Sequence, residues 1–89
     1  MKKIAKYFTA PWCGPCRMYK PVVQEVISEG HAIEEVNVDE NQDEAAKYGV
    51  MSVPIILILE VNTKKKTETV VDAIHGVVPK DELLRRLSA

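Results

Sequence analysis

The sequence predicts an α/β fold whose strands and helices follow the order β-α-β-α-β-β-α. Short segments rich in β-branched and aromatic residues alternate with segments of helical periodicity. Turn and capping residues separate these segments. A nearly unbroken apolar run at residues 53–61 is typical of a strand covered on both faces. We therefore expect a four-stranded mixed sheet flanked by helices on both faces, with a right-handed crossover in the first β-α-β unit.

The first strand is expected at residues 3–9, where Ile, Tyr, Phe and Thr precede a proline-containing turn. A helix should begin at Pro15, because the apolar residues that follow recur with the spacing of one helical face. Gly30 supplies the stop for this helix. Pro21 falls inside it and should kink it, since proline donates no backbone hydrogen bond.

The second strand is expected at residues 32–38. Asn41 and Glu44 have the spacing of a capping box, which predicts a short second helix that ends at Gly49. The apolar run at residues 53–61 follows this helix. It should occupy the middle of the sheet, because it is too short for a buried helix and rich in β-branched residues.

A hairpin and a terminal helix complete the predicted fold. After a polar tip at residues 62–66, residues 67–74 should return antiparallel to the apolar strand. Pro79 at a first helical position, with acidic residues in the first turn and arginines in the last, predicts the terminal helix. The side chains that this helix should bury are Leu83, Leu84 and Leu87.

Length and composition fit one small globular domain spanning residues 1–89. Hydrophobic residues make up 46% of the chain and charged residues 28%, as in ordinary soluble proteins. A net charge of −1 argues against binding to nucleic acid or to an anionic membrane surface. No apolar run reaches the length of a signal peptide or a membrane span. We expect a cytoplasmic monomer.

Both cysteines of the chain lie in the stretch Trp12-Cys13-Gly14-Pro15-Cys16, between the first strand and the first helix. Structural disulfides are rare in the cytosol, so this pair suggests chemistry. Backbone N–H groups at a helix N-terminus stabilise a thiolate, which predicts Cys13 as the attacking residue. Cys16 lies one turn further and should resolve the mixed disulfide. Gly14 permits a tight backbone path, and Pro15 fixes φ in the first turn.

Three features carry a resemblance to a known family: WCGPC after a strand, Ser52-Val53-Pro54 before the apolar strand, and Gly76 after the last strand. Together they resemble the thioredoxin family. The resemblance implies a thiol-disulfide oxidoreductase that reduces disulfide-containing substrate proteins, with an NADPH-dependent thioredoxin reductase as electron donor. It implies no cofactor or metal beyond the Cys13-Cys16 disulfide itself. It also implies a cis peptide bond at Pro54, opposite the cysteines.

A cis Pro54 would leave the backbone of Val53 free to pair with an extended substrate segment. Around it we expect a mostly apolar surface that accepts many protein disulfides. The residues expected to form this docking surface are Trp12, Gly14, Pro15, Met51, Val53, Gly76 and Val77.

The chain departs from the family pattern in two places. Tyr7 stands six residues before Cys13, where thioredoxins usually carry a buried aspartate, and Glu35 stands where the family often has lysine. We expect the Tyr7 hydroxyl, together with Glu35, to handle the proton of Cys16. The strand before the motif begins at residue 3, so we expect the fold to lack the usual extra N-terminal strand and helix.

Three other interpretations remain open on sequence alone. A glutaredoxin-like reductase would take its electrons from glutathione and would have this size, but its usual turn and glutathione site differ from CGPC and Gly76-Val77-Val78. A thioredoxin-fold accessory subunit would bind a partner without using the dithiol. A zinc site would need two more ligands, and the histidines at positions 31 and 75 have spacings unlike those of zinc fingers.

Overall fold

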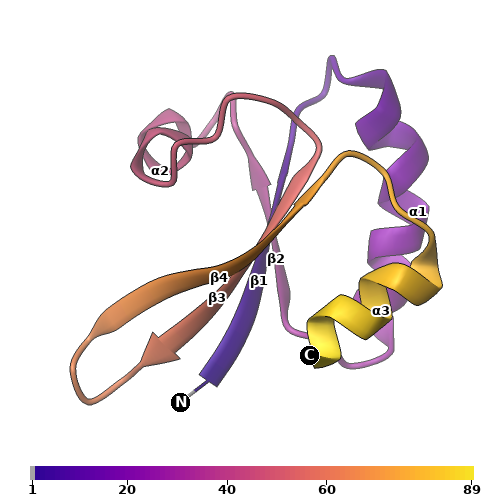
Figure 1. The fold of residues 1–89 in the computed structure, drawn as a ribbon. Helices are drawn as coiled ribbons and strands as arrows, with labels where there is room; N and C mark the ends of the chain where they lie inside the picture. The colour runs from indigo at the N-terminus through magenta and orange to yellow at the C-terminus, as the bar shows by residue number, and fades with distance from the viewer. Residues whose placement is uncertain (1) are drawn as a thin grey trace.

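A computed structural model describes residues 2–89 and contains seven elements in the predicted order (Figure 1). Their bounds differ from the predicted ones by one or two residues. The elements are β1 (Lys2–Thr9), α1 (Gly14–Ser28), β2 (Ile33–Asn37), α2 (Gln42–Lys47), β3 (Ile55–Asn62), β4 (Thr67–His75) and α3 (Lys80–Ser88).

The four strands form one mixed sheet in the order β2-β1-β3-β4. β1 runs parallel to β2 and antiparallel to β3, and β3 runs antiparallel to β4. The apolar run therefore lies inside the sheet, as predicted. Its residues from Ile55 to Leu59 are all buried, because helices cover the sheet on both sides.

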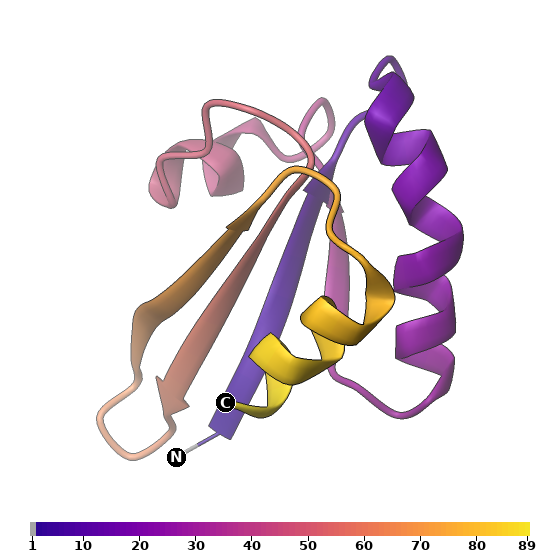
Figure 2. The same ribbon diagram turned by 45° about the vertical axis from the view of Figure 1, so that its right-hand side comes forward.

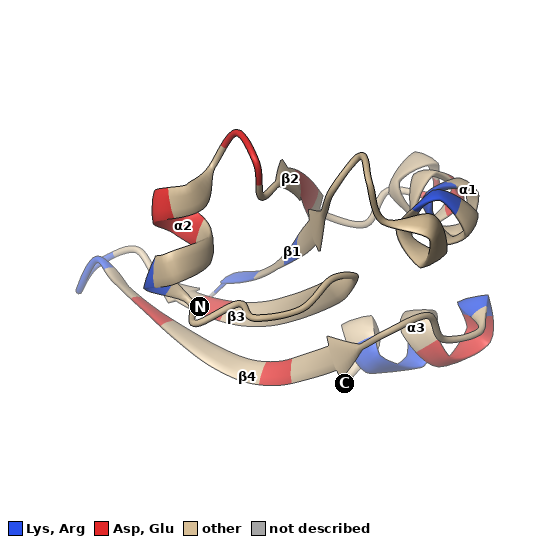
Figure 3. Cartoon of the chain, turned by 90° about the horizontal axis from the view of Figure 1, so that it is seen from above, with Lys and Arg blue, Asp and Glu red and all other residues tan. Residues whose placement is uncertain are grey.

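The helices are divided between the two faces of the sheet. α1 and α3 cover one face, and α2 lies over the other (Figures 1 and 3). Figure 2 shows α3 crossing the sheet beside α1. Because side chains alternate along β1, Tyr7 packs with Tyr19 and Leu83 on the face of α1 and α3, whereas Phe8 packs near Tyr48 on the face of α2. The sheet is thus packed between two hydrophobic layers, one under α1 and α3 and one under α2.

Both glycine stops are confirmed. Gly30 and Gly49 follow α1 and α2 with φ of 101° and 67°, in the left-handed region that favours glycine. α1 continues through Pro21 to Ser28. In α3, Leu83 is fully buried, and Leu84 and Leu87 pack against the core as partly buried residues.

The predicted capping box at the start of α2 is wrong. Asn41 occupies the N-cap position, but its side chain donates to the Asn37 carbonyl oxygen at 3.0 Å. The Glu44 carboxylate accepts a hydrogen bond from Lys6 Nζ at 2.6 Å. A charged partner from the sheet thus replaces the weaker bond to a backbone N–H. Pro79 likewise lies at the N-cap of α3 rather than at its first helical position.

Lys6 connects β1 to α2 through a partly buried ion-pair network. Its ammonium group lies 3.1 Å from Glu34 and 2.6 Å from Glu44, and only 11% of its side chain is exposed. It also lies 5.7 Å from the centre of the Tyr48 ring. Burial alone would lower the pKa of Lys6, but the two carboxylates reverse this effect and raise the pKa above its usual value.

Replacing Lys6 by methionine is expected to lower the free energy of unfolding by about 1–2 kcal/mol, because two carboxylates lose a poorly solvated partner. The exposed Lys47, which lies 3.8 Å from Glu68, provides the matched control. Lys47→Met should change stability by less than about 0.5 kcal/mol. Urea unfolding of both variants measures their free energies of unfolding. Equal losses in the two variants would contradict a stabilising role of the buried Lys6 ion pairs.

Candidate active site

The two cysteines lie where β1 leads into α1. Cys13 is the N-cap residue of α1 and Cys16 lies in its first turn, with their Cα atoms 5.2 Å apart across a disulfide. The sulfur of Cys13 accepts the backbone N–H of Cys16 at 3.2 Å. It therefore occupies the position of the usual oxygen acceptor at a helix N-cap. Once the disulfide is reduced, this N–H group and the helix dipole favour a thiolate at Cys13.

Both cysteines are shielded from solvent. Cys13 is 5% exposed and Cys16 2% exposed, and they pack with Ala10, Val38 and Val53. Cys16 is the more deeply buried of the two and lies beneath the turn. This arrangement suits an attacking residue at position 13 and a resolving residue at position 16.

The sheet topology brings three separate segments to the cysteines. In the strand register, Phe8 near the end of β1 pairs with Ile55 at the start of β3, and Ile55 pairs with His75 at the end of β4. The segments that adjoin these positions are the WCGPC turn, the loop that contains Val53 and Pro54, and Gly76. All three therefore lie at one end of the sheet (Figure 1).

The loop that contains Val53 and Pro54 lies directly against the Cys13-Cys16 disulfide. The Val53-Pro54 peptide bond is cis, as the resemblance implied. The carbonyl oxygen of Val53 lies 3.7 Å from Cys13 Sγ. Gly76 donates its backbone N–H to the Pro54 carbonyl oxygen at 2.9 Å, which ties the loop to the end of β4. Gly76 has a φ of 74°, in the left-handed region that favours glycine.

The residues expected to dock a substrate include three large exposed apolar side chains. Trp12 is 66% exposed, Met51 97% and Val77 51%. Gly14 and Pro15 are also exposed, whereas Pro54 is buried and Val53 and Gly76 are partly buried. Exposed apolar side chains around a buried reactive group are typical of a surface that binds other proteins.

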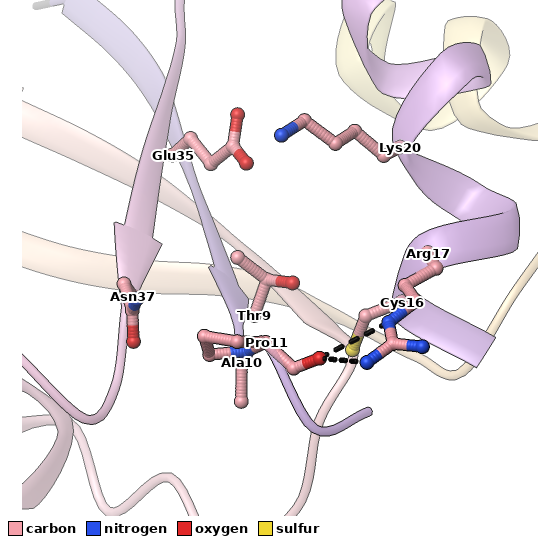
Figure 4. Close-up of a pocket in the computed structure, with 8 residues that line it drawn as sticks. All are labelled: Thr9, Ala10, Pro11, Cys16, Arg17, Lys20, Glu35 and Asn37. Carbon is pink, nitrogen blue, oxygen red and sulfur yellow. Dashed lines mark hydrogen bonds between the residues drawn. The ribbon is translucent and has the colours of Figure 1, made fainter. Parts of the chain in front are cut away.

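An open pocket of about 630 Å³ lies between α1 and β2 and is lined in part by Cys16 (Figure 4). In Figure 4 the Glu35 carboxylate and the Lys20 ammonium group face each other across it. Glu35 also accepts a hydrogen bond from Gln24 at 2.9 Å. The residues that line the pocket are Thr9, Ala10, Pro11, Cys16, Arg17, Lys20, Glu35 and Asn37. Glu35 and the largely buried Cys16 thus line one open pocket.

Tyr7 lies beneath Cys16. Its side chain is fully buried, and its hydroxyl donates to the Cys16 carbonyl oxygen at 3.2 Å. Burial raises the pKa of Tyr7, and the nearby Glu35 carboxylate acts in the same direction. Tyr7 therefore stays a protonated donor that holds the backbone of Cys16. Tyr7 and Glu35 make separate contacts, and their joint role in proton transfer stays a prediction.

Sequence reasoning missed two contacts of the turn. Trp12 Nε1 donates to Asp39 Oδ1 at 3.2 Å, and the Arg17 guanidinium donates twice to the Pro11 carbonyl oxygen. The first joins residues 27 positions apart, and the second ends on a backbone carbonyl. Neither kind of contact leaves a local pattern that sequence analysis can detect.

The described part of the chain offers neither a metal-binding cluster nor a membrane-spanning helix. Within residues 2–89, no group of three or more His, Cys, Asp or Glu side chains is arranged to hold a metal ion. Among the same residues, no helix has the length and apolar character needed to cross a membrane.

Comparison with known proteins gives consistent relatives. The family model described as thioredoxin matches residues 2–89. A thioredoxin of Bacillus subtilis is 44% identical over 79 residues, which cover 85% of this chain and 70% of the relative. A thioredoxin of Listeria monocytogenes is 46% identical over 79 residues, covering 85% and 71% of the two chains. The solved structure of a mutant thioredoxin from Halobacterium salinarum superposes with a TM-score of 0.81 at 31% identity, covering 97% of this chain and 72% of that one.

Proposed function

The chain belongs to the thioredoxin family and is a protein-disulfide reductase, and we propose that an NADPH-dependent thioredoxin reductase supplies its electrons. The observation that carries this proposal is the Cys13-Cys16 pair at the N-terminus of α1, facing an exposed apolar surface rather than a closed small-molecule site. The proposal includes a single domain of residues 1–89 that works as a monomer in the cytoplasm, where thiols are kept reduced.

The reaction transfers two electrons from the dithiol to a substrate disulfide. The Cys13 thiolate attacks one substrate sulfur, so that a bond from Cys13 to this sulfur forms and the substrate S–S bond breaks. The departing substrate thiolate takes up a proton. Cys16 then loses its proton and attacks Cys13 Sγ, which releases the second substrate thiolate and leaves the Cys13-Cys16 disulfide.

The docking surface is proposed to hold an extended substrate segment beside Cys13. The Val53 carbonyl is available for pairing next to the reactive sulfur, and Trp12, Met51 and Val77 supply apolar contact on either side. Gly14 and Gly76 have no side chain that would obstruct the approach, and Pro15 adds only a compact apolar ring. Such a surface carries few groups that select one sequence, so many protein disulfides should bind.

The proton of Cys16 is proposed to leave through the pocket toward Glu35. Both residues line this pocket, and water that enters it would supply the path. Tyr7 contributes by holding the Cys16 carbonyl oxygen, and so the position of the sulfur that must be deprotonated. The Glu35 carboxylate on β2 would thus accept the proton of Cys16 in a chain that has Tyr7 where the family usually has a buried aspartate.

Replacing Glu35 by glutamine should slow release of substrate from the mixed disulfide by about three- to tenfold near neutral pH, as expected for loss of a solvent-exposed base. Tyr7→Phe should slow the same step, because it frees the backbone of Cys16. Stopped-flow measurement of this step across pH tests both changes. The control is Glu34→Gln, since Glu34 pairs with Lys6 outside the pocket. An unchanged rate and pH profile in both variants would show that bulk water accepts the proton.

The electron donor is tested by reducing the oxidised chain in two ways. NADPH with a bacterial thioredoxin reductase should drive insulin-disulfide reduction through catalytic amounts of the chain. Reduced glutathione with glutathione reductase should support much slower turnover. The reverse order of rates would contradict the proposal and identify a glutaredoxin-like reductase.

A further inference from the structure

We propose that Arg17 is a positioning residue that fixes the segment preceding Cys13. Its guanidinium group donates two hydrogen bonds to the Pro11 carbonyl oxygen, from Nε at 3.1 Å and from Nη2 at 2.7 Å (Figure 4). Arg17 directly follows Cys16, and Pro11 lies two residues before Cys13. The contact therefore joins the two ends of the segment that contains both cysteines.

Few other hydrogen bonds restrain this segment, although Ala10 and Cys13 are packed against the core. Residues 10–13 connect β1 to α1 outside any helix or strand, and Pro11 and Trp12 are exposed. The Cys13 N–H donates to the Ala10 carbonyl oxygen at 3.2 Å, and the Trp12 indole donates to a side chain of another loop. The Pro11 carbonyl oxygen is held by Arg17 alone among the described contacts of residues 2–89.

Arginine suits this contact better than other cations would. Its guanidinium is planar and permanently charged, and it presents several donors in a fixed geometry. Hydrogen bonds from charged donors are stronger than neutral ones, although exposure to solvent reduces their net effect. Arg17 lies on the exposed side of α1, so its replacement should leave the hydrophobic core intact.

The expected consequence concerns the reduced protein, in which no covalent bond holds the two sulfurs together. Fixing Pro11 limits the conformations open to Cys13, and so raises the effective concentration of one sulfur at the other. Closure of the disulfide is then favoured. Loss of the contact should destabilise the disulfide relative to the dithiol, and so raise the reduction potential.

The experiment uses Arg17→Met with two readouts that need neither a reductase nor a protein substrate. Trp12 is the only tryptophan of the chain, so acrylamide quenching of its fluorescence reports on this segment directly. Quenching should increase in the variant. The equilibrium constant for disulfide formation against glutathione should fall by about three- to tenfold, which corresponds to about 15–30 mV.

Two further variants separate positioning from charge. Lys20→Met removes a cation from the same helix and pocket, but Lys20 has no hydrogen bond to the segment. It should leave Trp12 quenching unchanged. Arg17→Lys keeps the charge with one donor group and should give intermediate values in both measurements. The proposal is overturned if Arg17→Met changes neither readout, or if Lys20→Met reproduces its effects. Failure of the thioredoxin reductase assay alone would leave both readouts intact and would count against the proposed donor only.

Discussion

Serine in place of Cys13 is expected to abolish disulfide reduction, lowering kcat/KM at least about a thousandfold. A hydroxyl group remains protonated near neutral pH, and its oxygen does not exchange with a disulfide. The substitution should spare the fold, because serine is a preferred N-cap residue and can accept the Cys16 N–H that the sulfur accepts now. The loss would therefore report on the chemistry of position 13. Insulin-disulfide reduction with the thioredoxin reductase system measures it.

To test whether the fold is spared, the thermal stability of Cys13→Ser should be compared with that of the reduced wild-type chain. The oxidised chain carries an additional covalent link between Cys13 and Cys16, which by itself changes stability. Thermal unfolding of the two reduced proteins should agree within a few degrees. If Cys13→Ser retained activity within about tenfold of wild type, Cys16 would have to attack substrates, and the proposed division of roles would be wrong.

The fold was predictable because each element carries a local signal. The apolar run at residues 53–61 needed only its length and composition to be placed inside the sheet, and Gly30 and Gly49 marked helix ends that the structure confirms through their positive φ angles. The position of Cys13 at a helix N-terminus also followed from local patterns. Such signals depend on a few neighbouring residues, so they can be recognised without knowledge of the tertiary contacts.

What sequence reasoning missed depends on contacts between distant residues. Asn41 and Glu44 have the right spacing for a capping box, but Lys6 lies 38 positions from Glu44 and binds its carboxylate. The cis bond at Pro54 came from the family resemblance, because the residues around it carry no signal for that isomer. Arg17 and Tyr7 both donate to backbone carbonyls, which every residue provides. Local pattern cannot identify acceptors of this kind.

Serine in place of Cys16 is expected to stop the reaction after its first step. Cys13 should still attack, because its environment at the helix N-terminus is retained. No second thiol then exists in the chain to release the product, since Cys13 and Cys16 are its only cysteines. The mixed disulfide with the substrate should accumulate to about one equivalent, while steady-state turnover falls by about a hundredfold or more.

Mass spectrometry under non-reducing conditions measures this adduct, and dithiothreitol should release it. Cys13→Ser, treated with the same disulfide substrate, is the matched control and should form little adduct, because Cys16 is only 2% exposed and lies beneath the turn. An adduct that forms on Cys13→Ser but not on Cys16→Ser would reverse the proposed roles. Rapid turnover by Cys16→Ser without added thiol would show that substrate leaves the mixed disulfide without attack by a second thiol of the chain. In that case the spacing of Cys13 and Cys16 would not be needed for the reaction.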